Sequence, residues 1–402
     1  MGRPKQAIIV LGLTYNQIPL IAKAREMGYR AIAIGVGGGQ PVAAEHADAW
    51  FLIDTSAGDD VLALAKRENA AGLVTCGTST AMCTAAYVTE ALGLSDKVIS
   101  YEVSRNAVFK DRFRKLLADM IPRGLASADA SEAFSLARDF CYPLILKPGD
   151  GGGGKGITVV RTPEPDAFAQ AFAYAVEHSR SRVVVVEEFI EGAVLGVESL
   201  VLDGRVHVLA IADKDVTAPP RCITLGVSFP SMLPEPIQQN IRQTNAAAIS
   251  QLGITWGATH IDLAVTAEGR AKIIDIGPRL AGGPLMSHLV PDACDFDVYR
   301  AVIDLAVGRM PQSPGQGNRK HYASRFLVAP GPGTLQSVTF PAAAAAECGV
   351  ENIRQLVPNG TVLDDPANDG ARLLLFTTKA DSHELARKNL DAFTQAIEVN
   401  LE

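Results

Sequence analysis

A run of glycines between two lysines, Lys147 to Lys155, constrains this chain more than any other feature. Backbone N–H groups that have no neighbouring Cβ can approach anionic oxygens closely. The run nearly matches the phosphate-binding P-loop pattern, but Gly156 stands where that pattern needs Ser or Thr. The β-branched residues 157–160 predict a strand, whereas a P-loop needs a helix there. We therefore predict a hairpin that covers phosphate, rather than a turn without function. Its tip is formed by Gly152, Gly153 and Gly154.

The first hundred residues alternate between short apolar runs and helical periodicity. This alternation predicts a parallel sheet with helices on both faces. The predicted strands are Ala7–Leu11, Ala31–Gly35 and Gly72–Thr75, and the predicted helices are Gln17–Met27, Val61–Glu68 and Thr80–Leu92. The turns at Gly12 and Gly35 lack a full GxGxxG pattern, so we do not expect NAD to bind there.

The remaining chain favours antiparallel hairpins, which gives a mixed α/β and α+β fold. One hairpin turns at Gly204, between strands Glu198–Leu202 and Val206–Ala212, and another turns at Glu268-Gly269, between His260–Val265 and Lys272–Ile276. Further predicted strands are Pro143–Lys147, Ile157–Val160, Val183–Phe189, Ser324–Val328 and Arg372–Thr378, and further predicted helices are Phe109–Ala118, Pro236–Leu252 and Glu384–Ile397.

Composition excludes several classes of function. A net charge of -7 argues against nucleic acid as a partner, because phosphate backbones need clustered Lys and Arg. No apolar run reaches the roughly 20 residues that span a bilayer, so we expect no membrane insertion. The apolar opening is better explained as a buried first strand than as a signal peptide. Six scattered cysteines without a CxxC pair predict free thiols in a reducing cytoplasm.

Five motifs, in order along the chain, resemble the ATP-grasp superfamily. They are the helix around Lys110, the strand ending at Lys147 before the glycine loop, the segment Val186–Gly192, the strand carrying Asp262 and the strand carrying Asp275 with Arg279. The resemblance implies an N-terminal Rossmann-like domain over residues 1–103 and an ATP-grasp region over 104–315. It places a lid subdomain at about 121–192 and a C-terminal closing domain at 316–402, with the boundary near Pro311–Asn318.

The resemblance also implies which residues would bind ATP and which would be catalytic. Lys110 and Lys147 would neutralise ATP phosphates, and Glu187 with the Ile190 backbone would bind adenine. The implied ATP-binding set is Lys110, Lys147, Gly152, Gly153, Gly154, Glu187, Glu188, Phe189, Ile190 and Glu198. Glu188 is expected to face away from Glu187, because neighbouring strand residues alternate faces. Arg279 and Lys155 are implied to be catalytic.

Asp262 and Asp275 are implied to hold Mg²⁺ or Mn²⁺. An argument from charge supports this role, because two carboxylates facing each other across a hairpin repel unless a positive group lies between them. His260 is expected to be structural. The superfamily pattern Glu-x-Asn-Pro-Arg is replaced here by Asp275-Ile-Gly277-Pro-Arg279. Gly277 offers no side-chain oxygen, which predicts a weaker hold on one metal ion.

Within the superfamily, the chain resembles carboxylate–amine ligases of the L-amino acid ligase kind. The similarity lies in the segment after Arg279, in Asp213-Lys214 and in Phe229-Pro230-Ser231. The substrate residues that it implies are Arg221, Gly282, Gly283, Ser287 and His288. Val194 stands where a ribose-contacting Glu is frequent in the superfamily. Thr224 and Val227 stand where relatives often have Glu and His, and these two differences predict an acceptor unlike theirs.

The predicted function is therefore ATP-dependent ligation of a small carboxylate to an amine through an acyl phosphate, by a homodimeric cytoplasmic enzyme. Two alternatives stay open from the sequence. One is ATP-dependent carboxylation through carboxyphosphate, which would use the same lysines and metal strands. The other is a nucleotide-binding protein without turnover, which the residues at positions 262, 275 and 277 would suit.

Overall fold

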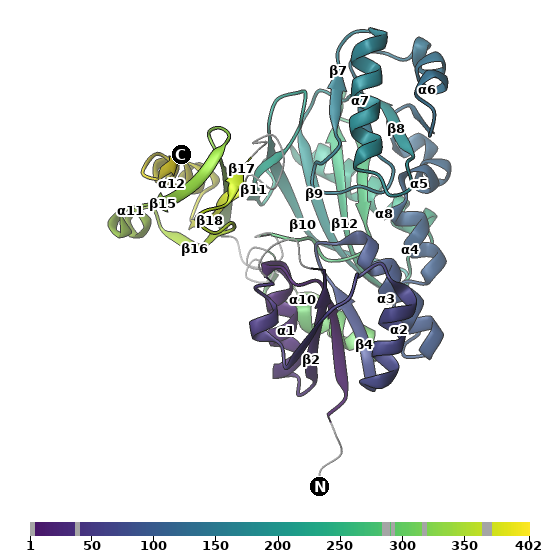
Figure 1. Cartoon of the computed structure of the whole chain (residues 1–402), viewed down its shortest axis with the longest axis vertical. Helices are drawn as coiled ribbons and strands as arrows, with labels where there is room; N and C mark the ends of the chain where they lie inside the picture. Colours follow the sequence, from purple (N-terminus) through teal and green to yellow (C-terminus); the bar gives the residue numbers. More distant parts are fainter. Residues whose placement is uncertain (1–4, 37–40, 284–289, 291–293, 316–319, 364–371) are drawn as a thin grey trace.

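The computed structural model describes residues 5–36, 41–283, 290, 294–315, 320–363 and 372–402. The chain forms an N-terminal domain, a lid subdomain, a large central sheet and a C-terminal domain that projects to one side (Figure 1). In the N-terminal domain the sheet has the order β3-β2-β1-β4, and all its pairings are parallel, as predicted. These strands are β1 (Ala7–Leu11), β2 (Arg30–Gly35), β3 (Ala49–Leu52) and β4 (Ala70–Thr75).

Helices cover both faces of the parallel sheet. They are α1 (Ile18–Glu26), α2 (Gly58–Arg67), α3 (Ser79–Leu92) and, from much later in the chain, α10 (Val298–Ala306). The late helix packs directly on β4, because a Cβ on Gly72 would lie 2.8 Å from the carbonyl oxygen of Ala306. This contact fixes the N-terminal domain against the rest of the protein.

The predicted helix Phe109–Ala118 corresponds to α5 (Lys110–Leu116), and the preceding helix α4 (Tyr101–Val108) was not predicted. The two helices meet at Phe109, an extended residue with φ −84° and ψ 117°. Lys110 is therefore the first residue of α5, and its backbone N–H, which has no partner within the helix, donates to the carbonyl oxygen of Gly149 at 2.9 Å.

The lid subdomain is a four-stranded antiparallel sheet of order β5-β8-β6-β7, covered by two helices. Its elements are β5 (Gly124–Ser127), α6 (Ala130–Leu136), β6 (Leu144–Pro148), β7 (Thr158–Val160), α7 (Pro165–Glu177) and β8 (Val184–Glu188). Phe168 and Phe172 of α7 are buried against this sheet. The pairing of β6 with β7 confirms that the glycine loop connects two strands of a hairpin.

The central sheet has eight strands in the order β13-β12-β9-β10-β11-β14-β18-β16. They are β9 (Val194–Leu202), β10 (Arg205–Val216), β11 (Thr224–Phe229), β12 (Gly257–Val265), β13 (Ala271–Gly277), β14 (His321–Val328), β16 (Val350–Gln355) and β18 (Arg372–Ala380). Both predicted hairpins are present. The turn at Asp203-Gly204 has positive φ at both residues, as two-residue hairpin turns favour. Helix α8 (Glu235–Gln251) packs against this sheet.

The C-terminal part adds a small sheet of order β17-β15-β19 and two helices. Its elements are β15 (Gly333–Thr339), α11 (Ala342–Glu347), β17 (Val362–Leu363), α12 (His383–Gln395) and β19 (Glu398–Leu401). Strands β14 and β18 belong to the central sheet, so hydrogen bonding continues across the boundary expected near residue 315. Within the described residues, no helix has the length and apolar character that a bilayer crossing demands.

Candidate active site

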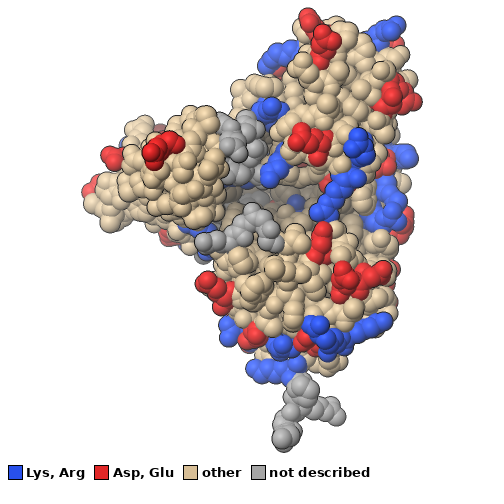
Figure 2. Space-filling view, viewed as in Figure 1, with Lys and Arg blue, Asp and Glu red and all other residues tan. Residues whose placement is uncertain are grey.

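A cavity of about 1120 Å³ lies where the lid, the central sheet, the N-terminal domain and the C-terminal domain meet. Figure 2 shows the surface hollowed between the lobes, with basic and acidic side chains on the rim. Most of the candidate residues line this cavity, namely Lys110, Lys147, Gly152, Gly153, Gly154, Lys155, Glu187, Glu188, Phe189, Ile190, Asp262, Asp275, Arg279, Gly282 and Gly283.

Lys110 contacts both the central sheet and the lid. Its ammonium group lies 2.7 Å from Oδ1 of Asp275 on β13 and 3.4 Å from the carbonyl oxygen of Gly151. The side chain is 7% exposed. A nearly buried ammonium group with one carboxylate partner keeps donors for a further anion, because it has three N–H bonds.

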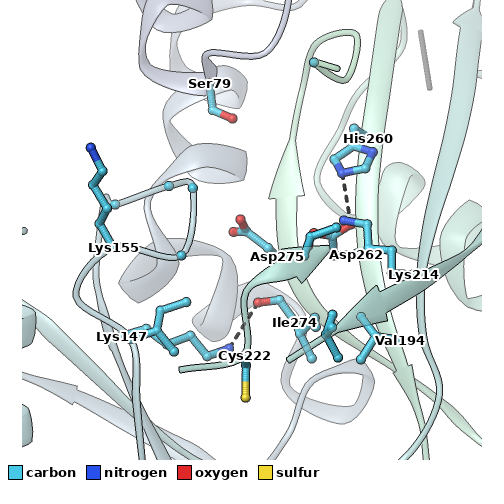
Figure 3. Close-up of a pocket in the computed structure, with 18 of the residues that line it drawn as sticks. Ser79, Lys147, Lys155, Val194, Lys214, Cys222, His260, Asp262, Ile274 and Asp275 are labelled. Atoms are coloured by element: carbon cyan, nitrogen blue, oxygen red, sulfur yellow. Dashed lines mark hydrogen bonds and ion pairs between the residues drawn. The ribbon is translucent and has the colours of Figure 1, made fainter. Parts of the chain in front are cut away.

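Lys147 lies near the end of β6, in the lid. Its Nζ lies 2.5 Å from Oε2 of Glu187 and donates to the carbonyl oxygen of Ile274 at 3.2 Å (Figure 3). The other oxygen of Glu187 pairs with Arg114. Glu187 is buried, and its carboxylate holds the ammonium group of Lys147 in position. The sequence assigned Glu187 to adenine, but the structure surrounds this carboxylate with two cations.

The glycine loop is anchored at its base and open at its tip. Asp150 accepts hydrogen bonds from the Ser179 hydroxyl and from the backbone N–H groups of Arg180 and Ser181. At the tip, Gly153 and Gly154 have φ near +70° and +79°, a region that side chains with a Cβ rarely adopt. Glycine is therefore favoured at positions 153 and 154 by the backbone conformation.

The end of β8 forms another wall of the cavity. Glu188 accepts from the backbone N–H of Cys141 at 2.9 Å and lies 3.5 Å from Arg123, partners different from those of Glu187. This agrees with the expected alternation of faces. The backbone N–H of Phe189 donates to the carbonyl oxygen of Pro143. Ile190 follows and lines the cavity.

Asp262 and Asp275 are direct partners across the β12–β13 pair, so both side chains project from the same face of the sheet. Asp262 also receives two donors at one oxygen. Nζ of Lys214 lies 2.5 Å from Oδ1, and Nε2 of His260 lies 2.9 Å from the same atom (Figure 3). Burial opposes ionisation of Asp262, but Lys214 and His260 hold its pKa well below the ordinary value.

Glu198 does not line the cavity, contrary to the sequence expectation. It is 1% exposed on β9 and pairs with Nδ1 of His260, its register partner on β12. Glu198 therefore supports His260, which supports Asp262. Burial alone would lower the pKa of His260, but the carboxylates of Asp262 and Glu198 raise it. The expectation of a structural His260 fits this arrangement.

The guanidinium group of Arg279 occupies the space above Gly277. A Cβ on Gly277 would lie 2.7 Å from Cζ of Arg279, so any side chain there would displace the arginine. Nη1 of Arg279 donates to the carbonyl oxygen of Leu280 at 3.3 Å, and the buried Nε has no hydrogen-bond partner among the described residues. Glycine at position 277 thus leaves room for the guanidinium group of Arg279.

Gly282 and Gly283 lie against the N-terminal domain. The backbone N–H of Gly283 donates to Oδ1 of Asn16 at 2.7 Å, and a Cβ on Gly282 would lie 3.2 Å from the Cα of Gly77. The backbone N–H of Gly77 in turn donates to Leu280. The N-terminal domain thereby forms one wall of the cavity. Two further predicted substrate residues, Ser287 and His288, lie outside the described residues.

Arg221 does not line the cavity, so its predicted grip on a substrate is not supported. Its guanidinium group stacks on the ring of Tyr174 at 4.4 Å and donates to the Thr158 hydroxyl at 3.1 Å. The adjacent Pro220 accepts from the backbone N–H of Val159 at 2.9 Å. These contacts attach the loop between β10 and β11 to the lid.

We expect Arg221→Ala to loosen this attachment. A cation–π contact and a hydrogen bond together contribute about 1–2 kcal/mol. Amide hydrogen exchange over residues 149–160 and 217–223 should therefore accelerate by about fivefold to 30-fold. The matched control is Arg161→Ala, which removes a 62%-exposed lid arginine and should leave exchange unchanged. A rise in KM for one substrate, with unchanged exchange, would restore the original interpretation.

Sequence reasoning missed three residues that shape the cavity. Arg114 lies one helical turn after Lys110, a spacing that could have indicated a shared face. Lys214 was noticed as part of a motif but given no role. Asn16 sits in the N-terminal domain, which carried no site prediction. All six cysteines are free, as expected. Cys76 is buried, and this burial raises the pKa of its thiol to about 12.

Comparison with protein families gives two matches along the chain. Residues 106–310 match the model of the carbamoyl-phosphate synthase L chain, ATP binding domain, and residues 325–402 match L-amino acid ligase C-terminal domain 2. The first match covers more than half of the chain. It includes Lys110, Lys147, the glycine loop and the paired aspartates Asp262 and Asp275.

Among curated proteins, the chain is 28% identical over 243 residues to the uncharacterized protein y4rH of Sinorhizobium fredii, covering 60% of this chain and 49% of that protein. It is 26% identical over 302 residues to the carbamoyl phosphate synthase large chain of Archaeoglobus fulgidus, covering 71% and 27%. The chain thus spans half or less of the length of these relatives.

Solved structures share the fold over the whole chain. An L-amino acid ligase from Bacillus licheniformis superposes with a TM-score of 0.82 at 17% identity, covering 100% of both chains. The biotin carboxylase domain of a Hydrogenobacter thermophilus 2-oxoglutarate carboxylase, solved with MgADP and bicarbonate, gives 0.77 at 17% identity, covering 100% of this chain and 92% of that one. This chain belongs to the carbamoyl-phosphate synthase L chain ATP-binding family, within the ATP-grasp superfamily.

Proposed function

We propose that this protein is an ATP-dependent ligase that joins a small carboxylate to an amine and releases ADP and phosphate. The observation that carries the proposal is the convergence, in one cavity, of two lysines and two aspartates from three separate segments. Lys110 and Lys147 come from α5 and the lid, and Asp262 and Asp275 come from the central sheet. The match of residues 325–402 to an L-amino acid ligase domain favours amide formation.

In this proposal the adenine ring lies against the end of β8, and the glycine loop covers the phosphates. The backbone of Ile190, which lines the cavity, would contact the ring edge. Lys110 and Lys147 then donate to phosphate oxygens as point charges. Arg114 and Glu187 hold Lys147 in position, so no reorganisation is needed when the phosphates arrive.

The aspartates suit a magnesium ion that the nucleotide helps to hold. The described residues contain no group of three or more His, Cys, Asp or Glu side chains able to hold a metal. However, Mg²⁺ is commonly held by one or two carboxylates together with phosphates and water. Asp262 and Asp275 meet that requirement as neighbours on one face. Bound Mg²⁺, or Mn²⁺ in its place, would neutralise charge on the phosphoryl oxygens.

The reaction has two balanced steps. A carboxylate oxygen of the substrate attacks the γ-phosphorus, the bond to the ADP oxygen breaks, and an acyl phosphate forms. The amine nitrogen then attacks the acyl carbon, the carbon–oxygen bond to phosphate breaks, and the amine loses a proton. Arg279, two residues after β13, would stabilise the acyl phosphate, and Lys155 at the lid would contact the transferring phosphoryl group. Gly282 and Gly283, which pack against Asn16 and Gly77, would form the wall beside the substrates.

A second candidate is carboxylation through carboxyphosphate. The structural similarity to a biotin carboxylase domain that was solved with bicarbonate supports carboxylation as this second candidate. In that reaction bicarbonate replaces the organic carboxylate, and the same cationic groups would serve. A homodimer remains a prediction from the sequence.

The discriminating experiment is a screen of ADP release over carboxylates crossed with amines, followed by mass spectrometry of the products. We expect release that needs one carboxylate and one amine together, with a product mass equal to their sum minus water. Lys147→Ala, measured in parallel, controls for contaminating ATPases. Release that requires bicarbonate would select carboxylation instead. Nucleotide binding without phosphate release under any mixture would contradict both enzyme functions.

A further inference from the structure

Lys214 reaches into the phosphoryl-transfer cavity from an unusual direction. It lies on β10, whereas Asp262 lies on β12, and strand β9 separates them. The lysine crosses β9 at Gly196, the register partner of Asp262. A Cβ at Gly196 would lie 3.2 Å from Cε of Lys214 and 3.1 Å from Cε1 of His260. The glycine therefore gives the lysine its path to Asp262.

The carboxylate of Asp262 is held by this lysine and by a second buried pair. Oδ1 receives Lys214 at 2.5 Å and His260 at 2.9 Å, while Glu198 fixes the far side of the imidazole. Lys214 is 10% exposed, yet it lines the cavity (Figure 3). The ammonium group of Lys214 thus neutralises Oδ1 of Asp262 and also lines the cavity in which the phosphates are proposed to bind.

The opposite side of the aspartate pair is also closed to an additional metal ion. Phosphoryl-transfer sites with two divalent ions need oxygen ligands for both, held about 3.5–4 Å apart. Gly277 provides no side-chain oxygen, and the guanidinium group of Arg279 fills the space above it. Oδ1 of Asp275 is engaged by Lys110. The protein therefore offers the remaining carboxylate oxygens of Asp262 and Asp275, enough for one shared ion.

We propose that Lys214 is a resident cation of the phosphoryl-transfer site, which takes a place that a second divalent ion would occupy. The inference rests on the proposed function. The ammonium group of Lys214 donates to an oxygen of the transferring phosphoryl group, and a single divalent ion binds between Asp262 and Asp275. Asp262 holds both the ion and the ammonium group, whereas His260 and Glu198 are positioning residues because they act through Asp262.

The test measures metal stoichiometry and nucleotide affinity rather than turnover. Mn²⁺ is titrated into the full chain with a saturating non-hydrolysable ATP analogue, and free Mn²⁺ is followed by electron paramagnetic resonance. The expected result is one Mn²⁺ per chain for the native protein. Two Mn²⁺ per chain would overturn the inference while leaving the proposed function intact. Absence of analogue binding would instead contradict the proposed function, and with it this inference.

The variant Lys214→Met adds an independent measurement. A hydrogen bond to a charged group contributes roughly 1.5–3 kcal/mol, so affinity for the analogue at saturating Mn²⁺ should fall about tenfold or more. The matched control is Lys272→Met on β13, whose ammonium group donates to the carbonyl oxygen of Asp119. It should bind like the native protein, and Lys214→Arg, which keeps the charge, should retain most of the affinity. Native affinity in a folded Lys214→Met variant would overturn the inference.

Discussion

Replacing Asp275 with asparagine is expected to reduce turnover by about 100-fold or more while hardly changing stability. The aspartate contributes charge to the shared metal ion, and metal stabilisation of phosphoryl transfer is worth several kcal/mol, where 1.36 kcal/mol is tenfold in rate. Its side chain is 41% exposed. Asparagine keeps an oxygen acceptor for Lys110, so the free energy of unfolding should fall by about 1 kcal/mol or less. Steady-state kinetics and urea unfolding measure the two effects.

A matched control is Asp391→Asn, which changes a 56%-exposed aspartate paired with Arg325 at 2.8 Å in the C-terminal domain. It removes the same charge from the same kind of ion pair, outside the cavity. Turnover in this variant should stay near the native value. If Asp275→Asn also retained native turnover, Asp275 would not be a metal ligand.

The variant Lys147→Ala is expected to weaken ATP binding by about 10-fold to 100-fold. The lysine is 6% exposed and preorganised by Glu187, and a hydrogen bond between charged groups contributes roughly 1.5–3 kcal/mol. The buried Glu187 keeps its pairing with Arg114, so the protein should still fold, with unfolding free energy lowered by about 1–3 kcal/mol. Calorimetric titration with a non-hydrolysable ATP analogue gives the affinity.

Lys272→Ala provides the comparison for that titration. It deletes a lysine of β13 whose ammonium group, among the described residues, donates to the carbonyl oxygen of Asp119. Its affinity should match that of the native protein. Unchanged affinity in Lys147→Ala would contradict the assignment of this lysine to the phosphate site. It would also remove the main support for phosphate binding under the glycine loop.

The sequence predicted the elements that have strong local signals. Glycine turns at positions 204 and 269 identified both hairpins of the central sheet, and β-branched residues after the glycine loop correctly indicated a strand. Strand β3 was missed because it has four residues at the edge of its sheet, with Trp50 and Leu52 exposed. Helix α4 was missed although the helix that follows it, α5, was predicted from Phe109 onward.

The side-chain partners could not be predicted, because they depend on how distant strands align. The sequence argument for magnesium relied on repulsion between Asp262 and Asp275. In the structure each aspartate already has its own lysine, so repulsion alone no longer requires a metal. Lys214 reaches Asp262 only across the glycine of an intervening strand. Likewise Arg221, in a loop that resembles a substrate border, turned out to contact the lid.

The proposed function depends most on where the triphosphate and its divalent ion bind in the cavity. A crystal structure with a non-hydrolysable ATP analogue and Mn²⁺, located by anomalous scattering, tests this directly. We predict phosphate oxygens within hydrogen-bond distance of the ammonium groups of Lys110 and Lys147, and one manganese peak between Asp262 and Asp275. A nucleotide bound away from these lysines, or manganese bound without either aspartate, would contradict the account.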